Sequence, residues 1–516
     1  AGQNRNLQHC RMRADEEVGQ DAGADAARRA VLQEDLACEK QCGARDRRYV
    51  DFDVLEISIE NFERREPRRD FRVDDVVDEE RSLRCGAFEL GFNLHWTLLL
   101  LALGEVQRRL LAGQASFEDV VAMLDAVDAN DALFQQLPLT NMPILENVAP
   151  YYFDWLAHPD YDDYWRRIAP KEYYDRITVP ALNIGGWYDL FLGGTLANYQ
   201  GMKARGGRPE ARANQHLIVG PWAHGVTGGA FGERAFGVRA GADVFDLTGH
   251  QLRWYDHWLK GIDNGIEREK PVQIFVMGAD VWREEDDWPL PDTAFTPYYL
   301  HSAGHANSLA GNGVLSTVQP DAEPEDVYLY DPRNPVPTVG GPTFLPGLFI
   351  GANAGPRDQR RVETREDVLC YTTEPLERAV EVTGPVELVL FASSSAPDTD
   401  FTGKLVDVAP DGRAMNLTEG ILRARYRESF SSPQLLEPGQ IYELHVDLWA
   451  TANVFLPGHR IRLEVSSSNF PRFDRNTNSG GVIASDGPDR LYPAVNRIYH
   501  DASHPSRVVL PLIVRD

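Results

Sequence analysis

The sequence predicts two folded regions of different class, an α/β region preceded by a helical segment and an all-β region that comes after it. Three observations predict this order. Between residues 177 and 259, short apolar strands alternate with helices. From Pro271 onward, short alternating runs are separated by Pro, Gly, Asp and Asn. The chain also has 516 residues, more than the roughly 250–300 that one core reaches, so we expect two or three domains.

The helical segment is expected over residues 86–150. Leu94–Ala112 has the apolar spacing of a helix, and Ser116 and Asp119 are spaced as a capping box before a second helix over Val120–Val127. Two helices joined in this way predict a helical hairpin that packs on a core or covers a site as a lid.

The α/β region is expected over residues 151–268. The sequence predicts strands over Ile177–Trp187 and His216–Gly220 and helices over Gly193–Arg205 and Thr248–Leu259. A strand–helix–strand–helix order indicates a parallel sheet covered by helices.

The all-β region is expected over residues 269–516. Many short strands separated by turn residues are typical of a β-sandwich, and we expect a jelly roll. The runs that predict it are Val272–Met277, Thr296–His301, Val386–Ala392, Leu405–Ala409, Tyr442–Leu448 and Arg460–Ser466.

Residues 1–85 differ in composition from the rest of the chain. They contain 37 charged residues and no tryptophan, and no glycine occurs between Gly43 and Gly86. One interpretation is a charged extension, partly helical or disordered. The other is that an out-of-frame translation produced this segment, so that it is not native to residues 86–516. Composition alone leaves both open.

Charge and apolar runs exclude two classes of partner. The net charge of −26 would repel a phosphate backbone, so we expect no nucleic-acid partner. The longest helical apolar run, Leu98–Leu103, is far shorter than the roughly 20 residues of a membrane span, so we expect no membrane partner. The oligomeric state is left undetermined.

The cysteines and the first residues bear on the compartment. Five cysteines are too few and too scattered for a disulfide framework, and Ala1–Gln20 holds no apolar signal segment, so a cytoplasmic chain is expected. Cys38 and Cys42 have the spacing of half a zinc site, but no second Cys/His pair occurs after them at finger spacing. We predict no metal and no cofactor.

Asp189 and His224 are the candidate catalytic residues. Each comes after a predicted strand and a glycine-containing turn, and reactive groups of open α/β sheets gather at that edge. A histidine there can serve as a general base, and a carboxylate can orient it. The alternatives are that Asp189 caps a helix and that His224 is structural. A metal-dependent hydrolase is disfavoured because no His-Glu-x-x-His cluster occurs.

Several motifs resemble one family. Gly-Gly-Trp-Tyr-Asp189 and Val-Gly-Pro-Trp-Ala-His224 are similar to the acid and base signatures of the CocE/NonD serine hydrolases, which resemble X-Pro dipeptidyl-peptidases. Further resemblance, from about residue 86 to 516, lies in the segments 86–92, 254–261, 355–359, 400–405 and 467–476.

The resemblance implies an α/β-hydrolase domain with a helical cap and a C-terminal jelly roll. It implies hydrolysis of small-molecule ester, amide or peptide substrates through an acyl-enzyme, with Asp189 as the acid and His224 as the base of a triad. By the same motif, Phe191 and Phe344 are expected to line the substrate pocket, although a buried aromatic ring is more often plain core. Trp187, Tyr188 and Trp222 are expected to pack rather than to react.

The chain departs from the family at the nucleophile. The family carries its serine in a Gly-x-Ser-Tyr-x-Gly turn upstream of the cap, and this chain contains no Gly-x-Ser-x-Gly. Ser58 and Ser82, the serines between Gly43 and Gly86, lack flanking glycines. We therefore assign no nucleophile and expect little or no hydrolysis. The competing hypothesis is an inactive pseudo-hydrolase whose jelly roll binds a ligand or partner. Without the upstream strands, we expect the strands before Asp189 and His224 to have an open edge.

Overall fold

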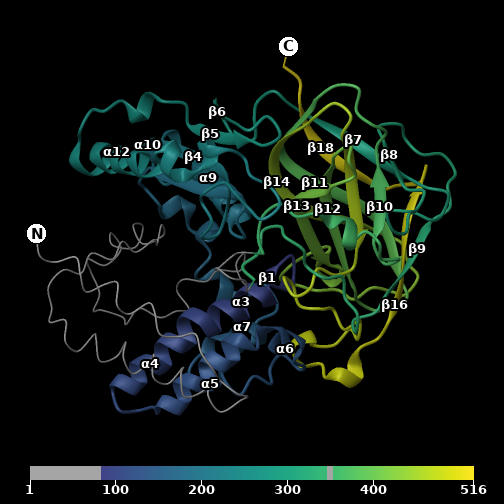
Figure 1. Ribbon diagram of the computed structural model, residues 1–516, viewed down its shortest axis with the longest axis horizontal. Coiled ribbons are helices and arrows are strands. Elements are labelled where there is room, and N and C mark those ends of the chain that lie inside the picture. The colour runs from purple at the N-terminus through teal and green to yellow at the C-terminus, as the bar shows by residue number, and fades with distance from the viewer. Residues whose placement is uncertain (1–82, 346–352, 516) are drawn as a thin grey trace, which may run out of the picture. The chain divides into compact units, whose positions relative to one another are not determined.

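The computed structural model describes residues 83–345 and 353–515, and its α/β part contains a four-stranded sheet. The strand order is β3-β4-β5-β6, in which β3, β4 and β5 run parallel and β6 runs antiparallel to β5. The bounds are Ala181–Tyr188 for β3, Gln215–Ala223 for β4, Val272–Val276 for β5 and Val281–Glu285 for β6. Figure 1 shows the sheet with helices α9, α10 and α12 beside it, and α11 precedes α12 in the chain. These helices span Leu192–Arg205, Pro209–Ala213, Leu247–Lys260 and, for α11, Ala242–Phe245.

The predicted elements of this part are confirmed with shifted ends. The first strand begins at Ala181 rather than Ile177, because Pro180 cannot donate a ladder hydrogen bond and a 3-10 turn over Tyr174–Arg176 precedes it. The second strand extends beyond the predicted Gly220 to Ala223.

One strand predicted for the β-sandwich pairs instead with the α/β sheet. We predicted Val272–Met277 as part of the β-sandwich, but β5 pairs with β4 over Val272–Ile274. The last residue of the predicted run hydrogen-bonds to the sandwich, where Met277 N donates to Ala452 O and Met277 O accepts from Val454 N. A short apolar run predicts a strand but not the neighbour with which that strand pairs.

The predicted open edge concerned β3 and β4. Among the described residues, β3 has no strand on its outer side. The prediction was wrong for β4, which lies between β3 and β5.

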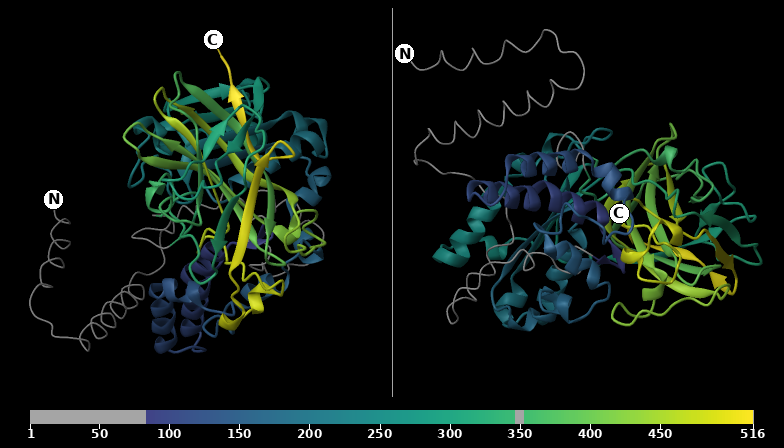
Figure 2. Two further views of the ribbon diagram at one scale, coloured as in Figure 1. Left: turned by 90° about the vertical axis from the view of Figure 1, so that its right-hand side faces the viewer. Right: turned by 90° about the horizontal axis from the view of Figure 1, so that it is seen from below.

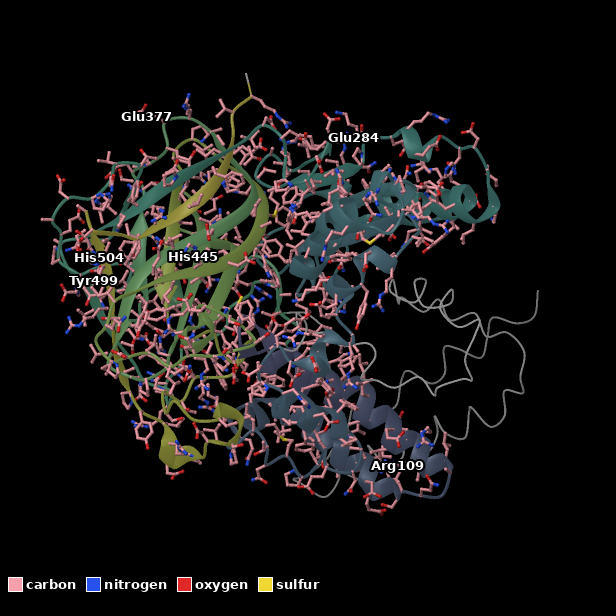
Figure 3. The ribbon with its side chains drawn as sticks, turned by 180° about the vertical axis from the view of Figure 1, so that it is seen from behind. Arg109, Glu284, Glu377, His445, Tyr499 and His504 are labelled. Atoms are coloured by element: carbon pink, nitrogen blue, oxygen red, sulfur yellow. The ribbon has the colours of Figure 1, made fainter. Side chains whose placement is uncertain are left out.

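The helical segment is a hairpin of long helices with shorter ones after it. A continuous helical stretch runs through α3, a π-helical stretch η3 and α4, and Ser116 and Asp119 form the predicted capping box at the start of α5. Figure 2 shows α4 and α5 side by side. Arg109 of α4, labelled in Figure 3, donates to Glu105 one turn earlier and to Asn147 O. The helices are α3 Leu90–Trp96, η3 Thr97–Ala102, α4 Leu103–Leu111, α5 Phe117–Asp128, α6 Asn130–Gln135, α7 Pro150–Ala157 and α8 Asp163–Arg166.

The all-β part is a twelve-stranded sandwich. Its strands pair antiparallel except β8 with β10, and Figures 1 and 2 show the sheet curling back on itself. Buried apolar side chains of these strands belong to one core cluster, which also includes residues of the α/β sheet. The strands are β7 Thr293–His301, β8 Val314–Ser316, β9 Asp326–Tyr330, β10 Leu369–Thr372, β11 Val380–Ser394, β12 Asp400–Val408, β13 Ala414–Arg423, β14 Tyr442–Phe455, β15 Arg460–Ser466, β16 Ala494–Asp501, β17 His504–Pro505 and β18 Arg507–Ile513. A two-stranded ribbon, β1 Leu83–Arg84 with β2 Ala87–Phe88, precedes the helices.

Short 3-10 turns connect these elements. They are η4 Pro170–Glu172, η5 Tyr174–Arg176, η6 Val238–Ala240, η7 Ile266–Arg268, η8 Gln359–Arg361, η9 Ala424–Tyr426, η10 Ile483–Ser485 and η11 Pro488–Arg490.

A buried ionic cluster fixes the start of the helical segment to the sandwich. Arg423 donates to Asp400 at 3.0 Å, to Asp474 at 2.7 Å and to Gly86 O at 3.0 Å. Asp474 Oδ1 also accepts from Phe88 N at 3.0 Å. Because every member of this cluster is paired, the cluster tolerates burial and determines where the helices begin.

Some predictions concern residues outside the described ranges, namely the character of residues 1–82 and the Cys38–Cys42 spacing. Within the described part of the chain, no helix combines the length and apolarity that a membrane crossing requires. Among those same residues, no three His, Cys, Asp or Glu side chains are grouped so that they could hold a metal ion.

Candidate active site

Asp189 lies one residue past the carboxyl end of β3, in a turn that leads into α9. Asp189 N donates to Gly186 O at 2.9 Å, and Leu192 N donates to Asp189 O at 3.1 Å. Its Oδ1 accepts from Phe191 N at 2.9 Å. This local turn holds the carboxylate with one oxygen engaged and directs the second oxygen toward β4.

His224 lies one residue past the carboxyl end of β4, in a tight turn. Ala223 and Val226 exchange backbone hydrogen bonds of 3.1 and 2.9 Å across it. Gly225 has φ +71°, which a residue with a Cβ seldom adopts, so the turn requires a glycine directly after His224. The close approach of β3 to β4 also needs glycine, because a Cβ on Gly186 would lie 2.4 Å from Trp222 O.

The two predicted residues meet. His224 Nδ1 lies 3.3 Å from Asp189 Oδ2, and the side chains are 40% and 21% exposed. A carboxylate at Nδ1 favours the tautomer that carries its proton there, which leaves Nε2 as the basic nitrogen. A distance of 3.3 Å is long for a hydrogen bond, and such bonds commonly tighten when substrate binds.

The two predicted pocket residues flank the histidine. The ring centroids of Phe191 and Phe344 lie 5.0 and 5.4 Å from that of His224, and both rings meet it edge to face. Phe191 comes from the turn before α9, and Phe344 comes from the β-sandwich region. All four predicted site residues are therefore brought together, from segments that are 155 positions apart at most.

Phe92 and Trp96 of α3 extend the group of aromatic rings formed by Phe191 and Phe344, and neither was singled out from the sequence. Phe92 lies 5.3 Å from Phe191, 6.0 Å from Phe344 and 5.5 Å from Trp96 between ring centroids. Phe92 belongs to the segment 86–92 that carries part of the resemblance, and its spacing of four from Trp96 was the available signal. His95, on the same helix, lies 5.8 Å from Phe344 and burial lowers its pKa.

The tryptophans and tyrosine beside the pair are structural, as expected. Trp187 Nε1 donates to Phe275 O at 2.7 Å, and Trp222 Nε1 donates to Ala240 O at 2.7 Å. The Tyr188 hydroxyl donates to Asn416 O at 3.2 Å, and burial raises the pKa of that phenol well above its usual range. Their polar atoms are used in holding the strands.

The arrangement can accept a proton at the histidine, stabilise the resulting imidazolium and hold an apolar group against three rings. The catalytic roles of Asp189 and His224 and the pocket roles of Phe191 and Phe344 stay predictions. The chain still has no serine in a Gly-x-Ser-x-Gly turn, so no nucleophile is assigned.

Comparison with known proteins gives two family matches. Residues 71–226 match the X-Pro dipeptidyl-peptidase (S15 family), and residues 264–509 match the X-Pro dipeptidyl-peptidase C-terminal non-catalytic domain. The first match includes Asp189 and His224, and the second includes Phe344.

Individual relatives agree with these matches. Cocaine esterase from Rhodococcus sp. (strain MB1 Bresler) is 44% identical over 431 residues, which are 83% of this chain and 73% of the esterase. An aminopeptidase from a Thaumarchaeota archaeon superposes with a TM-score of 0.66 at 27% identity over 83% of this chain and 69% of the other. An α-amino acid ester hydrolase gives 0.65 at 25% identity over 84% and 71%.

Three findings lead to one conclusion: the order of helical segment, α/β-hydrolase part and β-rich domain, the matches to the S15 family and its C-terminal domain, and the 44% identity to cocaine esterase. The chain belongs to the CocE/NonD family of serine hydrolases, which is related to the X-Pro dipeptidyl-peptidases.

Proposed function

We propose that this chain carries the acid–base half of a serine hydrolase site, in which His224 is the general base and Asp189 orients it. The observation that carries the proposal is the His224–Asp189 contact at the carboxyl edge of two adjacent parallel strands. A base in that place can take a proton from a nucleophile and return it to a leaving group.

The substrates we propose are small acyl esters, amides or X-Pro peptides, by analogy with cocaine esterase and the X-Pro dipeptidyl-peptidases of the S15 family. Phe191, Phe344 and Phe92 form an apolar wall beside the histidine and would hold the acyl side of the substrate. Apolar pockets with few polar groups are typical of small-molecule sites.

Activity of the chain as it stands is tested with a p-nitrophenyl ester series and a fluorophosphonate label. We expect turnover no faster than in H224A and no labelled serine, because the nucleophile turn is absent from the sequence. Fast turnover that the label abolishes and H224A lacks would identify a nucleophile elsewhere in the chain and overturn this expectation.

The roles of the pair are tested in a chimera. Residues 1–85 are replaced with the corresponding upstream segment of cocaine esterase, which supplies the nucleophile turn. We expect label-sensitive hydrolysis that falls roughly 10⁴-fold in D189N, as it does when a triad acid loses its charge. H224A should fall at least as far. An active chimera that keeps its rate in both variants would contradict the assignment.

A pseudo-hydrolase that binds a ligand or partner through its jelly roll is the second candidate, favoured by the missing Gly-x-Ser-x-Gly turn. Sequencing the coding DNA of residues 1–90 and translating all three frames separates the two. A Gly-x-Ser-Tyr-x-Gly in another frame upstream of the Gly86 codon would favour the enzyme, and an uninterrupted frame without it would favour the binding protein.

A further inference from the structure

A tryptophan of the β-sandwich has an unusual backbone conformation near the candidate site. Trp449, on β14, has φ +63°, which is strained for a bulky side chain. It sits at an irregularity in the pairing of β14 with β11, where the register shifts between Pro385 and Glu387. This irregularity is a β-bulge. Within it, Trp449 N donates to Asp447 Oδ1 at 2.7 Å, so a carboxylate of the same strand stabilises the bulge. β-Bulges re-aim a side chain, and they are common next to active sites.

The bulge directs the indole at the first turn of α9. A Cβ added to Gly193 would lie 2.6 Å from Trp449 Nε1 and 2.9 Å from Cε2, distances that real Cβ atoms do not show. Gly193 is therefore the residue that admits the indole, and the indole in turn limits how far α9 can move toward the sandwich.

The turn that holds Asp189 is part of the same unit. Leu192 N donates to Asp189 O at 3.1 Å, and Thr195 N and Oγ1 contact Phe191 O at 3.1 and 3.2 Å. Because these bonds join the Asp189 turn to the start of α9, a displacement at Gly193 is transmitted to the carboxylate.

The indole also contacts an arginine of the sandwich region. The Arg472 guanidinium lies 5.3 Å from the centroid of Trp449, and Arg472 donates to the buried Glu419 at 2.5 Å. A guanidinium that lies over an indole face and is also paired with a carboxylate has little freedom to move. Trp449 is therefore in contact both with Arg472 and with Gly193 in the first turn of α9.

From these contacts we infer that Trp449 is a positioning residue that sets where Asp189 meets His224. The inference rests on the proposed function and deepens it. It assigns a role at the site to the part of the chain that matches a domain described as non-catalytic. Trp449 acts through its contact with Gly193, in the first turn of α9, rather than on the reacting atoms.

The test uses the full chain labelled with ¹⁵N-histidine, with His224 assigned by comparison with H224A. The ring ¹⁵N shifts at a pH where the ring is neutral report which nitrogen carries the proton, a signature that a merely stabilising residue would not change. In the parent chain we expect the Nδ1–H tautomer to dominate. In W449G we expect a mixture of tautomers, because glycine adopts the positive φ freely and only the indole is lost.

A rescue pair keeps the test interpretable if W449G folds poorly. G193A is expected to lower the melting temperature and to mix the tautomers, whereas alanine at a helical glycine without this contact would raise the melting temperature. G193A/W449L should restore both readouts, because leucine ends at its Cδ atoms and has nothing at the positions of Nε1 and Cε2, which lie nearest the new Cβ.

The outcomes separate the two proposals. If D189N changes the tautomer and W449G and G193A do not, Trp449 has no positioning role while the Asp189–His224 pair stands. If G193A/W449L behaves like G193A, the contact does not carry the effect and the inference is overturned. If D189N leaves the tautomer unchanged, the pair fails, and this inference fails with it.

Discussion

Two histidine–aspartate pairs in this chain differ in almost every respect except their residue types. His224 and Asp189 lie 3.3 Å apart at the end of two parallel strands, and the histidine is 40% exposed. His500 and Asp326 lie 2.9 Å apart inside the sandwich, and both side chains are fully buried. The buried pair also has a serine, since Ser302 Oγ lies 2.8 Å from both Asp326 oxygens and 3.3 Å from His500 Nε2.

Both Asp326 oxygens and His500 Nε2 are engaged in hydrogen bonds with buried neighbours. Asp326 accepts from Ser302, His500, Ala306 N and Tyr371, and these bonds hold its pKa below the usual range although burial by itself raises it. Burial by itself lowers the pKa of His500, but the Asp326 carboxylate raises it overall. A serine, a histidine and an aspartate in contact thus form a structural cluster here. A basic nitrogen accessible at a strand end is what distinguishes the other pair.

The largest difference between the two pairs is expected in the free energy of unfolding when each aspartate is removed in turn. D326A should lower the free energy of unfolding by about 3–5 kcal/mol, because it leaves the buried imidazolium and two hydroxyls without their acceptor. D189A should cost less than about 1 kcal/mol, because its pair is partly exposed and screened. Urea denaturation of both variants measures the difference, and equal losses would contradict the distinction.

A buried carboxylate with few hydrogen bonds sharpens the comparison. Glu464 on β15 is 4% exposed, its Oε2 lies 3.4 Å from Lys404 Nζ, and its Oε1 accepts no hydrogen bond in the described part of the chain. Burial raises its pKa from 4.5 to about 7, in spite of the nearby ammonium. Burial therefore raises the pKa of Glu464, whereas hydrogen bonds lower the pKa of Asp326 in spite of its burial.

The sign of the pH dependence is set by that shift. Between pH 4.5 and about 7 the unfolded carboxyl is ionised while the native one keeps its proton, so stability falls as the pH rises through this window. The loss is about 3 kcal/mol at most, since each pKa unit corresponds to about 1.4 kcal/mol. E464Q should flatten this part of the profile, measured as unfolding free energy against pH. An unchanged slope would show that another group titrates there.

The site could be predicted from the sequence to the extent that local patterns define it. Asp189 and His224 each come after an apolar strand and a glycine turn, and this local pattern determines the edge at which both emerge. The capping box at Ser116 and the helix after Asp189 were predictable for the same reason. The closeness of Phe344 came from the family resemblance, not from any pattern that links residue 344 to residue 224.

The features that could not be predicted depend on long-range pairing. The run Val272–Met277 defines a strand, but its parallel partner is chosen by how the chain returns to β4. From the sequence, Trp449 has the pattern of an ordinary strand residue. Its indole faces α9 because β14 has one extra residue opposite β11, which forms a β-bulge. Single-strand patterns carry no information about register, so bulges and strand partners are beyond them.

The smallest expected effect is also the most direct test of whether the buried cluster is inert. S302A removes one of four donors to Asp326 and should cost about 1 kcal/mol, close to one net hydrogen bond. A fluorophosphonate should not label Ser302 in the folded parent chain, because the side chain is buried and its hydroxyl proton is directed at a carboxylate. Mass spectrometry of the treated protein locates any adduct. An adduct on Ser302 that is absent in S302A would mean that Ser302 is reactive in spite of its burial. Exposure at a strand end would then not be what distinguishes the two pairs.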